Sequence, residues 1–332
     1  MKIFYICEGE IGSDVKENYP SIEALRAFLL VAETKTVKEA AGKLGLTPSA
    51  VSQSLFRLEK DLGTELFQRD VRPLRLNASG RALVPEARAI VAAARALKHR
   101  MTADPSTLTL RIGLGETVSA TVAPWMLASL WNRVGRLETV SGFTQPLVTA
   151  LQEDKVDVVV TPEGLLNEDR WARERLYEED FLLVTGRDVP FPETAEALRK
   201  LARTRPVVDY GEGSSDEIAM DRVLRSMNAK PLRRVAVSSS HALVGLIAET
   251  GGWSVLPVTN LWCGRTFFEG VRFGPLPEGR RLLRTMWATG DALCASDAVR
   301  LTGEAAREAF AKRFLPELER TSKELVRYVR VG

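Results

Sequence analysis

The chain has 332 residues, 45% of them hydrophobic, which exceeds the usual size of a single core and predicts a multidomain protein. No run approaches the roughly 20 apolar residues of a membrane span and no secretory signal opens the chain, so we expect a cytoplasmic protein without a membrane partner. The net charge of +3 is uneven: residues 21–104 carry +5, residues 1–20 carry −2 and residues 105–332 carry zero, which places the excess where a nucleic-acid-binding module would need it.

Three helix patterns follow one another between residues 21 and 62. Ser21 is placed to cap the first helix, and Thr36, with a glutamate three residues later, is placed to cap the second. Gly45 breaks the second helix, and Thr47 followed by proline begins the third. Two short helices joined by a tight turn that contains glycine predict a helix-turn-helix.

The third helix, over residues 48–62, separates an apolar face from a polar one. Its apolar face steps by four, three and four residues through Val51, Leu55, Leu58 and Leu62. The opposite side carries short hydrogen-bonding groups and one aromatic ring, namely Ser49, Ser52, Gln53 and Phe56. Such groups suit base edges in a major groove, although any amphipathic surface helix also shows polar residues outward. Phe56 argues against that alternative, because a soluble helix gains nothing by displaying it.

A short segment over residues 66–77 brings three arginines together. Arg69, Arg72 and Arg75 are spaced by three residues, and Pro73 interrupts the segment. This pattern indicates a β-hairpin wing that reaches toward the DNA backbone, with a solvated charged loop as the alternative.

A long helix is predicted from Ser79 to Met101. Its apolar residues alternate steps of four and three, as in a coiled coil: Leu83, Ala87, Ile90, Ala94, Leu97 and Met101. A helix that exposes such a stripe needs a partner, so we predict dimerisation through it. Packing of the same stripe against the chain's own C-terminal domain is the alternative.

The N-terminal residues resemble the DNA-binding domain of the LysR-type transcriptional regulators. The resemblance covers about 60 residues: the run AAGKLGLTPSAVSQSLFRLE from Ala40 to Glu59, then Leu62-Gly63, Leu66-Phe67, Arg69, Leu76 and Gly80. It implies a winged helix-turn-helix, a dimerising linker helix and a two-lobed α/β effector domain built like a periplasmic binding protein. By motif position it implies DNA contacts at Thr47, Pro48, Ser49, Ser52, Gln53 and Arg57, with wing contacts at Arg69, Arg72 and Arg75.

Two positions depart from the family pattern. Asn77 stands where threonine is usual, and asparagine caps a helix equally well. Phe56 occupies a position that is usually polar, so we include it among the DNA-binding residues as one that could alter the reading of one base pair. Residues 1–20 have no counterpart in the pattern and are treated as an extension. The predicted DNA-binding domain covers residues 21–78 and the linker helix residues 79–103.

The C-terminal part, residues 104–332, is predicted to be an α/β effector domain. After a hinge at residues 104–106, strand-like and helical runs alternate in two series. The first has strands over 108–114, 137–140 and 156–161 with helices over 121–131 and 144–153; the second has strands over 206–209, 233–237 and 253–257 with helices over 215–227 and 241–250. Runs at 181–185 and 282–289 would cross between the halves, and a last helix starts near residue 297. We expect lobe I over about 107–162 and 281–332, lobe II over about 163–280, and a ligand cleft between them. The run Gly251–Pro257 also resembles the family's effector domain.

Candidate effector-binding residues lie at predicted helix starts, where free N–H groups favour an anion such as a carboxylate. They are Thr117, Ser119, Ser141, Thr144, Ser238, Ser239 and His241. Ordinary capping explains each hydroxyl equally well, and His241 fits a structural histidine as well as a ligand contact. The three cysteines, Cys7, Cys263 and Cys294, fit no disulfide framework or zinc site, and two histidines favour no metal centre, so no cofactor is expected. We favour small-molecule sensing over redox sensing by Cys263 and Cys294.

Together these features predict a transcriptional regulator that binds double-stranded DNA as a homodimer or homotetramer and responds to a small molecule, with RNA polymerase among the candidate partners. An enzyme tethered to DNA is the second hypothesis, but the sequence lacks a Gly-x-Ser-x-Gly elbow, a phosphate-binding Gly-Lys-Ser/Thr loop and paired metal ligands. The run Gly113–Glu116 also lacks the third glycine of a dinucleotide fingerprint. A solute-binding module without DNA binding is the third, and the outward polar set at residues 49–53 argues against it.

Overall fold

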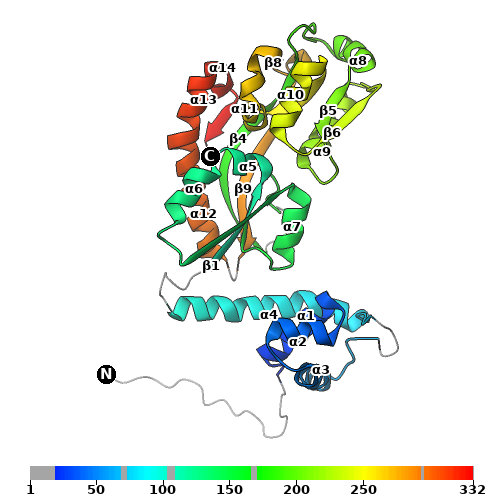
Figure 1. The fold of residues 1–332 in the computed structure, drawn as a ribbon, viewed down its shortest axis with the longest axis vertical. Coiled ribbons are helices and arrows are strands. Elements are labelled where there is room, and N and C mark those ends of the chain that lie inside the picture. The colour runs from blue at the N-terminus through cyan, green and yellow to red at the C-terminus, as the bar shows by residue number, and fades with distance from the viewer. Residues whose placement is uncertain (1–18, 69–72, 103–108, 166–169, 293–294, 332) are drawn as a thin grey trace, which may run out of the picture. The chain divides into compact units, whose positions relative to one another are not determined.

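The computed structural model describes residues 19–68, 73–102, 109–165, 170–292 and 295–331, and it omits the side chains of 92, 95, 96 and 98–102. The chain divides into two compact units, Met1–Ala94 and Arg95–Gly332. Figure 1 shows the helices and strands of both units with the labels used below. In the part of the chain that the structure describes, no helix is long and apolar enough to cross a membrane.

The N-terminal unit begins with three short helices whose caps match the sequence prediction. They are α1 (Ile22–Thr34), α2 (Val37–Leu44) and α3 (Pro48–Leu62). Ser21, Thr36 and Thr47 each use the side-chain oxygen to accept a hydrogen bond from the backbone N–H three residues on. Gly45 ends α2 with φ of 67° and Gly63 ends α3 with φ of 66°, a conformation that favours glycine. The predicted helix-turn-helix is therefore confirmed.

The two sides of the predicted wing are paired. Phe67 and Leu76 form an antiparallel bridge, and the Gln68 N–H donates to the Arg75 carbonyl at 2.9 Å. Asn77 caps the next helix, because its side-chain oxygen accepts from the Gly80 N–H at 2.8 Å. The substitution of asparagine for the family's usual threonine therefore preserves the cap.

The long helix α4 (Ala78–Thr102) matches the predicted linker helix and contains Pro85 near its start. Its first half is part of the N-terminal core: Ala87 is fully buried, and Leu83, Val84 and Val91 pack beside Phe28 and its buried neighbours. The coiled-coil stripe thus begins with residues that the N-terminal unit itself covers. The core of this unit depends on α4 as well as on α1 to α3.

The second unit is built on one ten-stranded sheet with the order β2-β1-β3-β9-β4-β7-β5-β6, in which β8 and β10 also pair with β4. Its strands are β1 (Thr109–Gly115), β2 (Arg136–Gly142), β3 (Val158–Thr161), β4 (Trp171–Gly186), β5 (Val207–Tyr210), β6 (Arg234–Val237), β7 (Trp253–Pro257), β8 (Val271–Gly274), β9 (Leu283–Asp291) and β10 (Val329–Val331). Strands β1, β2 and β3 are parallel, as are β5, β6 and β7. Antiparallel β4 and β9 run through both halves, so the predicted two-lobed α/β domain is confirmed.

Helices cover the sheet in both lobes. They are α5 (Glu116–Ala120), α6 (Ala123–Leu130), α7 (Thr144–Gln152), α8 (Ala195–Thr204), α9 (Ser215–Ser226), α10 (Ser240–Thr250), α11 (Val258–Cys263), α12 (Ser296–Ala309), α13 (Leu315–Thr321) and α14 (Lys323–Val326). In Figure 1, α6 and α12 lie on one side of the lobe I strands and α7 lies on the other. The helix predicted over 121–131 is confirmed as α6, although it starts two residues later, just before a proline that favours a first turn; the short helix α5 that precedes it was not predicted.

Candidate functional site

The outer face of α3 combines anchored leucines with exposed polar groups. Val51 and Leu58 are fully buried in the N-terminal core, and Leu55 is 8% exposed. The residues predicted to face DNA are all exposed: Thr47, Pro48, Ser49, Ser52, Gln53, Phe56 and Arg57. Phe56 stands out because 69% of its surface is exposed. The arrangement leaves the side chains of one helical face free to meet a partner.

A shallow hollow open to solvent lies along this face. It is lined by Tyr19, Ser52, Gln53, Phe56, Arg57, Lys60 and Asp61. Tyr19 was not predicted here, because it precedes the first helix in sequence and only the folded unit brings it beside α3. The hollow offers hydroxyl and amide groups, two aromatic rings and two cations, which suits base edges and phosphates. Arg75 is also exposed, while Arg69 and Arg72 lie outside the described residues.

The predicted dimerisation stripe divides into two parts. Ala87 is buried in the N-terminal core and Leu83 packs on it, so these two are already covered within the unit. Further along α4, Ile90 is 49% and Leu97 is 55% exposed. Ala94 is half-buried, and the side chain of Met101 lies outside the described residues. The free apolar surface is therefore narrower than the sequence pattern predicted.

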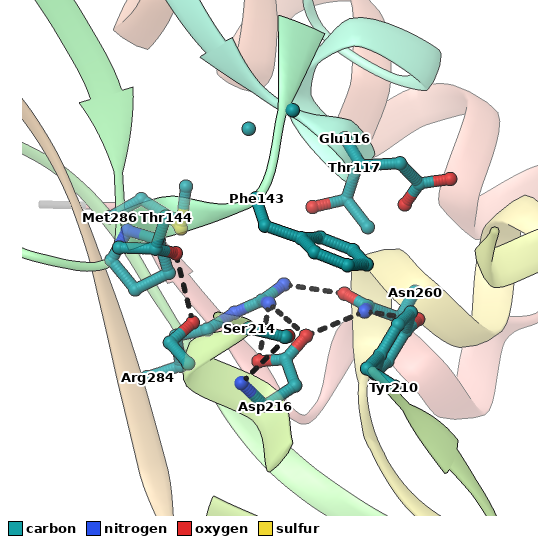
Figure 2. A pocket seen from close by; sticks show the side chains of 14 residues that line it. Glu116, Thr117, Phe143, Thr144, Tyr210, Ser214, Asp216, Asn260, Arg284 and Met286 are labelled. Carbon is teal, nitrogen blue, oxygen red and sulfur yellow. Dashed lines mark hydrogen bonds and ion pairs between the residues drawn. The ribbon is translucent and has the colours of Figure 1, made fainter. Parts of the chain in front are cut away.

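A cleft between the two lobes of the second unit is lined by side chains from six elements (Figure 2). Lobe I supplies the start of α5 and of α7, lobe II supplies the end of β5 and the starts of α9 and α11, and β9 crosses the floor. The lining residues are Gly115, Glu116, Thr117, Gly142, Phe143, Thr144, Pro162, Tyr210, Ser214, Ser215, Asp216, Asn260, Arg284 and Met286. The cavity measures about 30 Å³, room for about two waters. The cleft is thus nearly closed by the protein's own side chains.

A buried ion network forms the base of the cleft. Arg284 on β9 donates from Nη1 to both oxygens of Asp216 at 3.0 Å and from Nη2 to Glu179 Oε1 at 2.7 Å. Nη2 also reaches the Thr259 hydroxyl and the Asn260 side-chain oxygen. Although burial opposes the charged form, the two carboxylates raise the pKa of Arg284 above its ordinary value. A guanidinium held in this way is a permanent buried cation.

A chain of hydrogen bonds links lobe I to lobe II across the cleft. The Ser240 hydroxyl donates to Glu116 Oε2 at 2.5 Å, and the Ser240 N–H donates to Glu116 Oε1 at 3.1 Å. The Tyr210 hydroxyl lies 2.8 Å from the Ser240 hydroxyl and accepts from Asn260 Nδ2 at 2.6 Å. Burial raises the pKa of Tyr210, which keeps its proton available for this chain.

The structure brings together only part of the predicted effector set. Thr117 and Thr144 line the cleft, and the Thr144 hydroxyl donates to Ser215 Oγ at 3.2 Å across the lobes. Ser119 and Ser141 bond to each other at 2.8 Å and do not line the cleft. Ser238, Ser239 and His241 are also absent from its lining, and His241 is exposed with Nδ1 3.3 Å from the Cys263 carbonyl.

Sequence reasoning missed the charged residues of the cleft. Glu116, Asp216 and Arg284 each look like surface residues in the sequence, since their side-chain partners lie 24 to 124 residues away. One signal was present: Arg284 interrupts the apolar alternation of the predicted strand 282–289, where a charge has to be paired if it faces inward. In the described residues, no group of three or more histidine, cysteine, aspartate and glutamate side chains is arranged to hold a metal ion.

Comparisons with known proteins match both parts of the chain. Residues 22–81 fit the family described as bacterial regulatory helix-turn-helix protein, lysR family, and residues 103–309 fit the LysR substrate binding domain. A probable hydrogen peroxide-inducible genes activator of Streptomyces viridosporus is 30% identical over 84% of this chain and 92% of its own. The uncharacterized HTH-type transcriptional regulator YusT of Bacillus subtilis is 30% identical over 79% of this chain and 86% of its own.

Solved structures share the fold. A full-length OxyR variant of Pseudomonas aeruginosa, with one cysteine replaced by aspartate, aligns with a TM-score of 0.65 at 20% identity, covering 87% of this chain and 95% of that one. ArgP of Mycobacterium tuberculosis aligns with a TM-score of 0.64 at 20% identity, covering 87% and 96%. The helix-turn-helix, the two-lobed domain and the two family matches agree. The chain therefore belongs to the LysR family of DNA-binding transcriptional regulators, which are not enzymes.

Proposed function

We propose that the exposed face of α3 reads base edges in the major groove of double-stranded DNA. The supporting observation is that Ser52 and Gln53 are exposed while Leu58 on the same helix is fully buried. Hydroxyl and amide groups pair with base edges, and Arg57 with the wing arginines supplies phosphate contacts. As DNA regulation is a task of the cell interior, we also propose a cytoplasmic location.

A double substitution tests this role. Ser52→Ala with Gln53→Ala removes the base-reading groups and should cost about 1–3 kcal/mol of discrimination between the gene's upstream region and unrelated DNA. Ser129→Ala with Gln152→Ala is the matched control, since both residues are exposed on helices of the second unit. Gel shifts with both duplexes measure the preference, and an unchanged preference in the first variant would remove α3 from the role.

The regulators of this family act as oligomers, and we propose that the free part of α4 forms the dimer contact. Ile90 and Leu97 are the support, because both are apolar and about half exposed on one helix; Ala94 and Met101 extend the stripe in sequence. Ile90→Asp with Leu97→Asp should lower the molecular mass in sedimentation, whereas Leu232→Asp, at an exposed apolar residue outside α4, should not.

We propose that a small-molecule effector binds in the cleft, where lobes I and II meet. Thr117, Thr144 and the network around Arg284 support this, since polar groups converge there from both lobes. Among the described residues that line the cleft there is no unpaired cation for the carboxylate expected from the sequence, because Arg284 is paired with Asp216 and Glu179. A contact with RNA polymerase rests on the family alone.

Peroxide sensing is the second candidate, because several relatives are named as probable hydrogen peroxide-inducible genes activators. Cys263 does not favour it: burial raises the pKa of its thiol, so the reactive thiolate is disfavoured. Cys7 and Cys294 lie outside the described residues. If the protein senses a ligand, peroxide should leave its gel shift unchanged, and a change that Cys294→Ser abolishes would favour the redox alternative.

A further inference from the structure

The starts of α7, α9 and α11 contribute to the cleft lining, and the start of α10 lies beside it, bonded to Glu116; the chain itself uses a first-turn N–H at each of the four. The Gln145 N–H of α7 donates to the Gly213 carbonyl, and the Asp216 N–H of α9 donates to the Ser214 hydroxyl. The starts of α10 and α11 each hold a carboxylate: Ser240 donates to Glu116, and Thr259 donates to Glu179 from its N–H at 2.7 Å. Helix starts attract anions, and here two of them already bind the protein's own.

The guanidinium of Arg284, the cation of the cleft, has no hydrogen-bond donor left for a ligand. Among the described residues that line the cleft, Arg284 is the one cation, and a guanidinium has five N–H donors. All five point to acceptors of this chain, on Glu179, Asp216, Thr259 and Asn260. A carboxylate ligand would have to displace one of the buried carboxylates before it could bind Arg284.

The formal charge around the cleft is negative. Glu179 and Asp216 pair with a single guanidinium, and Glu116 lines the same cleft, which leaves a formal excess of two negative charges. Glu116 is the carboxylate within reach of a ligand, because it lines the cavity and is half-buried while Asp216 and Glu179 are buried. A carboxylate has about four lone-pair sites, and in the described chain Glu116 accepts two hydrogen bonds, both from Ser240.

Aromatic rings complete the lining. Phe143 and Tyr210 meet edge to face with ring centres 6.2 Å apart. In Figure 2 the ring of Phe143 lies between Glu116 with Thr117 on one side and Asp216 with Asn260 on the other. An aromatic face attracts a cation, and a carboxylate beside it strengthens that preference. This observation is independent of the charge count and points to the same class of ligand.

We propose that the effector carries an ammonium or guanidinium group that pairs with Glu116 against the ring of Phe143. The inference rests on the proposed role of the cleft and names the ligand class. Because the cavity has room for about two waters, such a ligand enters as Phe143 moves or the lobes part. A cation can use the lone-pair sites of Glu116 that Ser240 leaves open, so the ligand would bind beside a contact that joins the lobes.

The test uses the full chain and probes matched in size but opposite in charge. Agmatine, putrescine and butylammonium are compared with glutarate, succinate and butyrate at equal ionic strength, by thermal shift and calorimetry. We expect the cations to raise the melting temperature and the carboxylates to leave it unchanged. Glu116→Gln keeps the size of the side chain and an acceptor for Ser240, and it should weaken cation binding about tenfold to a hundredfold. Glu249→Gln, at an exposed residue at the end of α10, is the control.

Three results would overturn the inference. Stabilisation by the carboxylates but not the cations would reverse the ligand charge and leave the cleft as the effector site. Equal cation binding by native protein and Glu116→Gln would place the cation elsewhere. An unchanged melting temperature with both the cations and the carboxylates would also contradict the inference. The gel-shift assay with the α3 variant tests the DNA-binding role separately in each case.

Discussion

The side chains proposed to meet DNA and those that line the cleft are held in opposite ways. Ser52, Gln53 and Phe56 come from one helix and point outward, whereas the cleft residues come from six elements, and Asp216, Asn260 and Arg284 are buried. On α3 the groups that fold the helix and those that face the partner are different residues. In the cleft Asp216, Asn260 and Arg284 do both, because each is hydrogen-bonded to the other two inside the protein.

This difference predicts how substitutions behave. An exposed residue on α3 can be changed with little effect on the free energy of unfolding, so a loss of DNA binding there reports recognition. A change at Asp216, Asn260 or Arg284 instead removes a hydrogen-bond partner from a buried side chain. All six tryptophans lie in the second unit, so their fluorescence reports that unit alone and separates the two cases.

The strongest test of the comparison is Arg284→Met. It leaves Glu179 and Asp216 buried without their cation, which should cost about 3–5 kcal/mol of unfolding free energy in the second unit. Urea unfolding followed by tryptophan fluorescence measures the loss. Arg300→Met is the control, because Arg300 is exposed and its partners among the described residues, Asp297 and Glu304, lie on its own helix. A midpoint no lower than that of the control would contradict a stabilising network.

Leu58→Ala tests the stability of the first unit in the same way. The side chain is fully buried, so its truncation should cost about 2–5 kcal/mol. Far-UV circular dichroism should show early loss of helix while the tryptophan midpoint stays in place. Leu62→Ala, at a residue 37% exposed, should have a smaller effect. A parallel fall in the fluorescence midpoint would show that the units do not unfold separately.

Ser240→Ala tests the link between the lobes. The hydroxyl is buried and bonds to Glu116 and Tyr210, so its loss should cost about 1–3 kcal/mol in the fluorescence transition. Ser238→Ala is a close control, because Ser238 is two residues away and exposed. Equal effects of the two variants would mean that the hydrogen bonds across the cleft contribute nothing to stability.

The smallest expected effect is a pH dependence at Asp209. Burial raises the pKa of this carboxyl from 3.8 to about 6, against the lowering effect of Arg234. Between these two values the folded protein keeps a proton that the unfolded chain has released, so stability contributed by this group falls as the pH rises through about 6. Relative to Asp209→Asn, the native chain should lose about 1 kcal/mol between pH 5 and pH 7. A difference between the two proteins that does not vary with pH would contradict the raised pKa.

The sequence predicted the structure correctly where the pattern that determines a feature lies within a single helix or strand. The caps at Ser21, Thr36 and Thr47 and the 3.6-residue spacing of α3 fix which residues face outward, because a helix reveals its faces in its own periodicity. The alternation of strands and helices predicted the two lobes for the same reason. Strand β10 was missed since three residues at the chain end carry no period, although they pair with β4.

The sequence predicted that a cleft lies between the lobes, but it did not predict which residues line that cleft. Thr117 and Thr144 were found from helix starts, yet the rule also selected Ser238 and Ser239 and passed over Ser240, the buried one. A shift of one residue at the start of α10 decides which serine is buried and bonds to Glu116 of the cleft. The partners Glu116 and Ser240 are 124 residues apart, a separation that no local pattern bridges.

The burial of Ala87 has a practical consequence for exchanging sensory domains among regulators of this kind. A graft joined ahead of Leu83 would strip one wall from the N-terminal core, because Leu83, Val84, Ala87 and Val91 of α4 all pack there. The junction of a chimaera belongs beyond Val91, so that the foreign domain is fused to a helix whose first turns already pack in the core of the N-terminal unit.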